Sequence, residues 1–225
     1  MVRFIRFDNY EKASKYRMKI FASYSEGIVL DVGASQLPNK FLDESEKVDE
    51  VWLLDIEEPK KKLPRKYKKI ILFNIDNLEK QLPFSDNTFD TIILGEILEH
   101  LYNPFRALKE CKRILKPNGV LLISTPTPKY YLEIIHMLLF STPMGFPEHK
   151  ILLSRTQMIH FLSSIGFTID KVVGYSFWIP FIKLGFVQDK YTLPEFSTWQ
   201  QIYINRKRAI ANVEFSDYFF SIFSS

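Results

Sequence analysis

The stretch LPFSDNTFDTIILGEILEHLYNPFRALKECKRILKPNGVLLIST, residues 82–125, decides the fold. Within it, TFDTIIL (88–94) and VLLIS (120–124) are short apolar runs, which are typical of strands buried on both faces of a parallel sheet. Between them, Asn103 supplies a helix-capping side chain and Pro104 suits the first helical position. The order of strand, helix and strand predicts a βαβ unit with parallel strands and a right-handed crossover.

The predicted helix has an apolar stripe and a basic end. The stripe recurs at helical spacing and consists of Phe105, Leu108, Cys111, Ile114 and Leu115. Lys112, Arg113 and Lys116 fall in the expected last turn, where cations suit the negative end of a helix. Cys111 is the only cysteine, so the sequence predicts no disulfide within the chain and no cysteine cluster for a metal.

The composition fits one globular domain over residues 1–225. The chain is 46% hydrophobic and 25% charged, and its formal net charge of +4 allows an anionic partner without demanding one. We see no signal peptide, and no uninterrupted apolar run approaches the ~20 residues that cross a membrane. Together with the single cysteine, these features predict a cytoplasmic protein.

The sequence predicts three strands before residue 82, and an acidic residue lies near the carboxyl end of each. Residues 28–32 form a buried run before Gly33, residues 51–56 carry Asp55 at their end, and residues 70–74 precede Asp76. Asp55 lies 22 positions after Gly33 (55 − 33), close to the spacing at which dinucleotide-binding folds place a carboxylate for ribose hydroxyls. The alternative is a solvated aspartate at a strand end.

The 82–125 stretch resembles the second half of a class I S-adenosylmethionine-dependent methyltransferase domain. The shared pattern is LPF, an acidic turn, FD, an apolar strand, E-x-LEH-L, a proline-started helix, RxLKPxG and a strand ending in Thr-Pro. The resemblance implies an α/β, Rossmann-like, doubly wound fold. Its mostly parallel, seven-stranded sheet would have an antiparallel edge strand and helices on both faces. Residues 199–205 fit the antiparallel strand and residues 155–165, behind a capping box at Ser154 and Gln157, a further helix.

The resemblance also implies S-adenosylmethionine as the cofactor. The implied cofactor-binding residues are Asp31, Gly33, Ala34, Asp55, Ile56, Asp76, Asn77, Gly95 and Glu96. Asp55 and Asp76 would accept hydrogen bonds from the ribose and the adenine, and the glycines would let the backbone approach the cofactor. The chain departs from the family pattern where Ser35 and Leu37 stand at positions that are usually glycine.

His100 and His149 are the candidate catalytic residues. A neutral imidazole can accept the proton of an acceptor hydroxyl near pH 7. The alternative is that each histidine makes a structural hydrogen bond. Two histidines, Glu96 and Glu99 show no familiar ligand spacing, so we predict no metal site.

The remaining segments bear on the acceptor. We interpret residues 1–26 as a helical flap or a packing helix, residues 126–150 and 174–198 as substrate or lid insertions, and residues 209–225 as a C-terminal extension. The apolar runs at 130–146 and 175–187 favour a small-molecule acceptor that is lipid-linked, with peripheral membrane contact. The run EHKILLS (148–154) resembles runs in methyltransferases of surface-glycan synthesis, which implies a glycan as the acceptor. Nucleic acid is disfavoured, because the basic run at 60–69 carries one aromatic residue. The alternative function is a non-catalytic, methyltransferase-like binding or scaffold module; the oligomeric state is left open.

Overall fold

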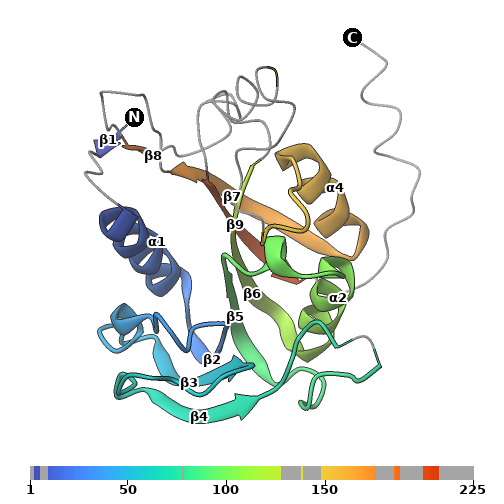
Figure 1. Cartoon of the computed structure of the whole chain (residues 1–225). Coiled ribbons are helices and arrows are strands. Elements are labelled where there is room, and N and C mark those ends of the chain that lie inside the picture. Colours follow the sequence, from blue (N-terminus) through green and yellow to red (C-terminus); the bar gives the residue numbers. More distant parts are fainter. Residues whose placement is uncertain are drawn as a thin grey trace.

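A computed structural model describes residues 3–5, 10–77, 79–127, 138, 148–175, 185–187 and 200–207 of the chain. Its centre is a seven-stranded sheet in the order β4-β3-β2-β5-β6-β9-β7 (Figure 1). The strands are β2 (Gly27–Val32), β3 (Val48–Asp55), β4 (Tyr67–Leu72), β5 (Phe89–Gly95), β6 (Leu115–Pro126), β7 (Phe167–Tyr175) and β9 (Gln200–Lys207).

The strand directions confirm the predicted fold class. β4, β3, β2, β5 and β6 run parallel to one another. β9 lies antiparallel between β6 and β7, so the edge strand β7 joins the sheet through an antiparallel pair. A separate two-stranded sheet pairs β1 (Arg3–Ile5) with β8 (Gly185–Val187).

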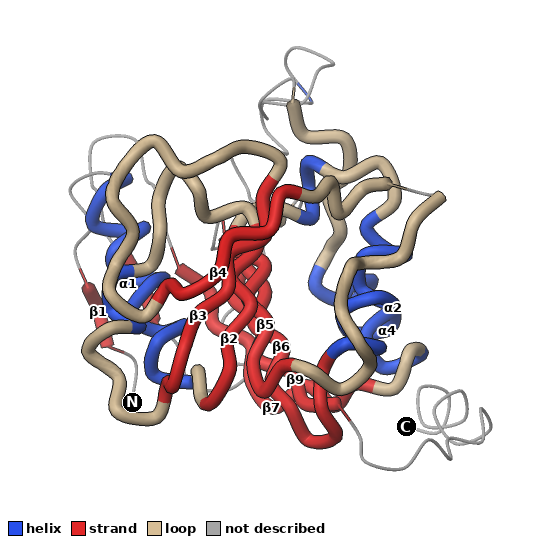
Figure 2. The backbone as a smooth tube through the Cα atoms, turned by 90° about the horizontal axis from the view of Figure 1, so that it is seen from below, coloured by secondary structure: helices blue, strands red, loops and turns tan. Residues whose placement is uncertain are grey.

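Helices cover both faces of the sheet. Helix α1 (Tyr10–Tyr24) packs on one face, whereas α2 (Pro104–Ile114) and α4 (Arg155–Ser164) cover the other (Figure 2). Two short 3-10 helices, η1 (Lys40–Leu42) and η2 (Leu98–His100), follow β2 and β5. No helix among the described residues has both the length and the apolar character needed to cross a bilayer.

Alternating side chains of the strands divide the core into two layers. Leu121 and Ile123 of β6 join the layer under α2 and α4, while Val120 and Leu122 join the layer under α1. This alternation follows from the two-residue period of a strand. Both layers are apolar because a parallel sheet is buried on both faces, which explains the continuous hydrophobic runs in the sequence.

Helix α2 differs from its predicted form in two respects. Phe105 is 36% exposed and stacks on Phe161 of α4, with ring centroids 4.3 Å apart, so it does not belong to the stripe buried against the sheet. The helix also ends at Ile114, and Leu115 and Lys116 begin β6. Instead of capping the helix, the Lys116 ammonium donates to the Asp90 carboxylate at 2.8 Å.

The other predicted elements are found with shifted boundaries. β4 begins at Tyr67, inside the basic run at 60–69 and before the strand predicted at 70–74. Helix α4 has the predicted capping box: Ser154 and Gln157 bind each other's backbone amides. Most of residues 126–150 and 174–198, and all of 209–225, lie outside the described residues, so the predictions for these segments remain predictions.

Candidate functional site

A cavity of about 60 Å³ opens at the carboxyl ends of β2 and β5. The chain leaves β2 toward β3 and leaves β5 toward β6 on the other side, so the loops diverge and a crevice forms between them. The cavity is lined by residues of α1, of both strands and of the loop after β2. The lining includes Arg17, Phe21, Asp31, Gly33, Ala34, Asn39 and Gly95.

The backbone at Gly33, on the cavity wall, adopts a left-handed conformation that favours glycine. Gly33 has φ +72°, and a Cβ built on it would lie 2.1 Å from Cδ1 of Ile97. Its N–H donates to the Leu54 carbonyl at 2.8 Å, which ties the loop after β2 to β3. Gly95 is close to Phe21, whose ring lies 3.3 Å from the position of an added Cβ. Bare backbone therefore faces the cavity at both strand ends.

Asp31 is buried at the base of the cavity. It accepts a short hydrogen bond from the Tyr67 hydroxyl, which in turn accepts from the Asn39 N–H at 2.8 Å. Burial raises the pKa of Asp31 from 3.8 to about 6, while the Tyr67 hydroxyl and nearby Arg17 oppose that rise. Burial and the Asp31 carboxylate both raise the pKa of Tyr67, so Tyr67 remains the donor.

The Asp55 carboxylate joins the ends of β2 and β3. One oxygen accepts from the Ser35 N–H at 2.9 Å, and the other accepts from the N–H groups of Ile56 at 2.7 Å and Glu57 at 3.3 Å. Ser35, which replaces the usual glycine, is buried and directs its amide to this carboxylate. Because a carboxylate offers about four acceptor positions and three are occupied by these amides, Asp55 keeps about one position for a ribose hydroxyl.

Asp76 holds a neighbouring loop. Its two oxygens accept from the backbone N–H groups of Tyr102 at 2.8 Å and Asn103 at 3.0 Å. The carbonyl of Asn77 accepts from the Arg106 guanidinium of α2. Asp76 and Asn77 therefore fix the segment after β4 against the start of α2 and lie outside the lining of the cavity.

A buried ion pair links α1 to the end of β5. Arg17 lies 3.3 Å from the Glu96 carboxylate, and both side chains are largely buried. Glu96 has φ +58°, an uncommon value for a residue with a side chain, and its N–H donates to the Ser124 carbonyl at 3.0 Å. The strained turn directs Glu96 toward Arg17 at the edge of the cavity.

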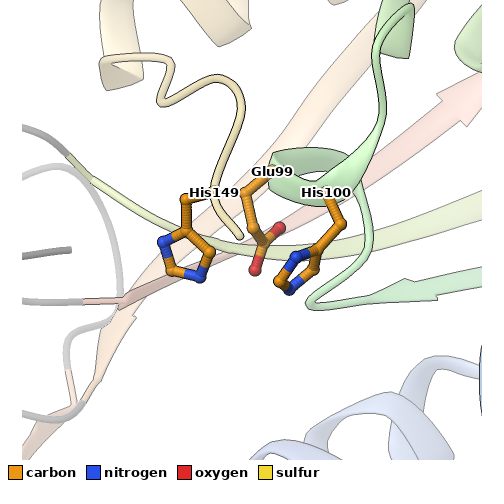
Figure 3. A group of neighbouring side chains, drawn as sticks. All are labelled: Glu99, His100 and His149. Atoms are coloured by element: carbon orange, nitrogen blue, oxygen red, sulfur yellow. The ribbon is translucent and has the colours of Figure 1, made fainter. Parts of the chain in front are cut away.

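Glu99, His100 and His149 converge beside this ion pair. The Glu99 carboxylate and the two imidazole rings lie close together, and the ring centroids are 5.0 Å apart (Figure 3). Glu99 is 1% exposed and accepts a hydrogen bond from the Thr125 hydroxyl at 3.2 Å. Burial, and then the Glu96 carboxylate, raise the pKa of Glu99 well above its ordinary range.

Backbone contacts hold the two histidine-bearing segments together. The N–H groups of Lys150 and Ile151 donate to the Glu99 carbonyl at 2.7 and 3.3 Å. The Lys150 ammonium donates to the His100 carbonyl at 2.6 Å and lies 3.6 Å from the centroid of the Tyr102 ring. The predicted catalytic residues thus meet in space, although 49 positions separate them in the sequence (149 − 100).

Four residues at this site were not predicted: Arg17, Phe21, Asn39 and Tyr67. Two of them, Arg17 and Phe21, lie on the buried face of α1. That face consists of Ala13, Ser14, Arg17, Met18, Phe21 and Ala22. Arg17 lies four residues after Ala13 and four before Phe21, so helical spacing places it on the same face as these small and apolar residues. This spacing was the signal available in the sequence. Tyr67 carried no local signal, because its partner is 36 positions away.

Comparisons with known proteins match the same region. A family profile described as "Methyltransferase domain" covers residues 30–123. A ubiquinone biosynthesis O-methyltransferase from Glaesserella parasuis serovar 5 (strain SH0165) is 32% identical over 109 residues, which cover 46% of this chain and 46% of that protein. The chain thus matches about half the length of this curated relative.

Solved structures share the fold. A SAM-dependent methyltransferase from Thermotoga maritima, described as a possible histamine N-methyltransferase, has a TM-score of 0.63 at 18% identity, covering 88% of this chain and 90% of that one. Another SAM-dependent methyltransferase, from Archaeoglobus fulgidus, has a TM-score of 0.63 at 19% identity, covering 89% and 96%. At these identities the likeness concerns the fold alone.

Proposed function

We propose that this chain, whose residues 30–123 form a class I S-adenosylmethionine-dependent methyltransferase domain, transfers a methyl group from that cofactor to an oxygen of a small-molecule acceptor. The observation that carries the proposal is the cavity at the carboxyl ends of β2 and β5, where Gly33 and Gly95 expose backbone beside the buried Asp31. The choice of oxygen follows the O-methyltransferase relative.

The residues around the cavity fit the cofactor. Gly33, Ala34 and Gly95 leave room for close approach of the methionine and ribose portions. Asp55 retains acceptor capacity for a ribose hydroxyl, and the 67% exposed Ile56 beside it offers an apolar surface to the adenine. Phe21, which lines the cavity, presents an aromatic face that favours a nearby sulfonium.

The cofactor, when bound, supplies an electrophilic methyl group on sulfur. The chain's own contribution is placement, because alignment of the acceptor oxygen can lower the barrier by several kcal/mol. The Glu99, His100 and His149 group lies next to the Arg17–Glu96 pair, which borders the cavity. We assign this group to the side from which the acceptor enters.

Asp76 and Asn77 have a supporting role in this proposal. Their contacts order the loop that leads to Tyr102 and α2, so they position the adenine-side wall. The lipid-linked or glycan nature of the acceptor, peripheral membrane contact and a cytoplasmic location remain part of the proposal; an activity change on adding liposomes would test the lipid component.

Calorimetric titration with S-adenosylhomocysteine, the demethylated product, tests the proposal directly. We expect one site per chain for the parent and at least about tenfold weaker binding for Asp55→Asn, whose amide NH2 replaces one of the two oxygens that accept from the backbone amides and the ribose hydroxyl. Glu57→Gln is the matched control, because the exposed Glu57 carboxylate accepts from the Gln36 side-chain amide at 3.3 Å and from no other side chain in the described part of the chain. Absence of binding at millimolar ligand would overturn the proposal and favour a non-catalytic scaffold.

A further inference from the structure

The donor set at the end of β5 is chemically suited to a metal. Glu99, His100 and His149 each offer one ligand atom, and these atoms all lie within 4.8 Å of one another. Two imidazoles and one carboxylate are a ligand set that proteins use for catalytic zinc and for other first-row divalent metals. We propose that Glu99, His100 and His149 bind a divalent transition-metal cation.

The surroundings already orient two of the three ligands. Nδ1 of His100 lies 3.3 Å from the Glu148 carbonyl, which can only accept, so Nδ1 carries the proton and Nε2 presents its lone pair. The Glu99 carboxylate is bound in turn by the Thr125 hydroxyl. Metal-binding histidines characteristically donate their other ring nitrogen to a carbonyl or carboxylate, and ligating carboxylates are themselves hydrogen-bonded.

The spacing requires only a modest contraction. Ligand atoms about 2.1 Å from a common zinc ion lie roughly 3.4 Å apart in a tetrahedral site. Closing the present group, whose ligand atoms lie within 4.8 Å, takes shifts of about 1 Å, which imidazole rotation supplies. The backbone contacts from Lys150 and Ile151 to the Glu99 carbonyl hold the two segments at this separation.

The local charge also favours a cation. Glu99 is buried, and Glu96 supplies a second carboxylate in the same loop after β5, where Arg17 pairs with Glu96 at 3.3 Å and the Lys150 ammonium donates to the His100 carbonyl. Burial of an ionised carboxylate is costly unless a positive charge or strong donors compensate it. A divalent cation between Glu99 and the two imidazoles supplies that compensation.

Three protein ligands leave coordination positions open for an oxygen donor. Resting on the proposed function, we assign one open position to the acceptor hydroxyl at the edge of the cofactor cavity. The metal would hold and acidify this hydroxyl, so that its proton passes to water as the oxygen takes the methyl group. His100 and His149 are then ligands and not proton acceptors, because a metal-bound nitrogen has no free lone pair. This assignment replaces the base role that the sequence predicted for them.

Zinc and cobalt binding by tag-free, chelator-treated full-length protein tests the site. We expect one Zn²⁺ per chain by competition with a chromophoric chelator, and a visible Co²⁺ absorption band that shifts on adding acetohydroxamate, an oxygen-donor ligand. Glu99→Gln, His100→Ala and His149→Ala should each weaken Zn²⁺ binding by about 100-fold or more. His160→Ala is the matched control, because His160 is exposed on α4.

Binding of S-adenosylhomocysteine by the same variants separates this inference from the proposed function. Zinc binding without nucleoside binding would retain the metal site and overturn the methyltransferase proposal. Nucleoside binding with zinc below one-tenth of an equivalent, or with zinc affinity unchanged in His149→Ala, would overturn the metal site alone. Circular dichroism of each variant confirms that lost binding is not lost folding.

Discussion

Among single residues, Asp31 links the cavity to the pH dependence of folding. Its folded pKa of about 6 exceeds the ordinary 3.8, so the native state holds a proton that the unfolded chain has lost between these values. The stabilisation is therefore fully present below pH 4 and is lost as the pH rises through 6. Because Asp31 is fully buried, the difference between its folded and ordinary pKa corresponds to about 3 kcal/mol in the free energy of unfolding.

We expect Asp31→Asn to flatten this dependence. The amide oxygen still accepts from the Tyr67 hydroxyl but does not ionise, so the free energy of unfolding should fall less between pH 4 and 7 than in the parent. Urea denaturation at several pH values provides the measurement. Asp49→Asn, on the exposed face of β3, should retain the parent's dependence; identical curves for parent and Asp31→Asn would contradict the assignment.

Gly33 makes a second residue-scale prediction. Alanine at φ +72° is strained, and its Cβ would collide with Ile97, so Gly33→Ala should cost about 1–3 kcal/mol of stability. Ile97→Ala removes the collision and leaves the backbone strain. A double-mutant cycle by urea denaturation should therefore show favourable coupling; strict additivity would mean that Ile97 already moves away without cost.

The positions of candidate site residues were predictable from the sequence where they depend on local pattern. Gly33 and Asp55 followed from predicted strand ends and Gly95 from the family resemblance, and each lies at the carboxyl edge of the sheet as the parallel arrangement requires. Pairings across the fold were not predictable. The Arg17–Glu96 pair depends on how α1 lies on the sheet, which periodicity alone does not specify.

At the scale of elements, the capping box of α4 is a direct target. The Ser154 hydroxyl accepts from the Gln157 N–H at 3.4 Å, and the Gln157 side chain accepts from the Ser154 N–H at 2.9 Å. Ser154→Ala should cost about 1 kcal/mol of unfolding free energy by thermal or chemical denaturation. Ser164→Ala, at the exposed last turn, serves as the control and should change stability by less than about 0.5 kcal/mol.

Arg113 ties α2 to the loop before β5. Its guanidinium donates to the Phe84 carbonyl at 2.8 Å, the Leu82 carbonyl at 3.1 Å and the Glu110 carboxylate at 2.9 Å. Lysine cannot reproduce this fork, so Arg113→Lys should destabilise the fold by about 1–3 kcal/mol. Arg65→Lys, on the exposed segment before β4, is the comparison; equal effects by urea denaturation would refute a specific role for the fork.

The sequence patterns predicted the right helices and strands, but some of the predicted boundaries differ from those in the structure. Leu115 continues the helical period of α2, yet it pairs with Phe89 in the sheet, because tertiary pairing overrides local propensity. The strand β4 likewise starts within a lysine-rich run, since it has β3 as its only partner and lysines suit the exposed edge.

At the scale of the whole molecule, the sheet separates two apolar layers that should respond independently to substitution. Leu108 of α2 packs in one layer and Leu122 of β6 in the other, and both are fully buried. Each change to alanine should cost about 2–5 kcal/mol, and the double variant should show their sum within about 0.5 kcal/mol. Marked non-additivity by urea denaturation would indicate that the layers are coupled through β6.

The strand order also determines how long strand edges stay unpaired while the chain is synthesised on the ribosome. β6 ends at Pro126, whereas its outer neighbour β9 is not complete until Lys207, which is 81 residues later (207 − 126). At translation rates of roughly 5–20 residues per second, the apolar edge of β6 remains unpaired for roughly 4–16 s before β9 is complete. β7 emerges within this interval and pairs with β9 alone in the seven-stranded sheet, so the nascent chain carries two unpaired strand edges at once, a period in which chaperone protection matters most.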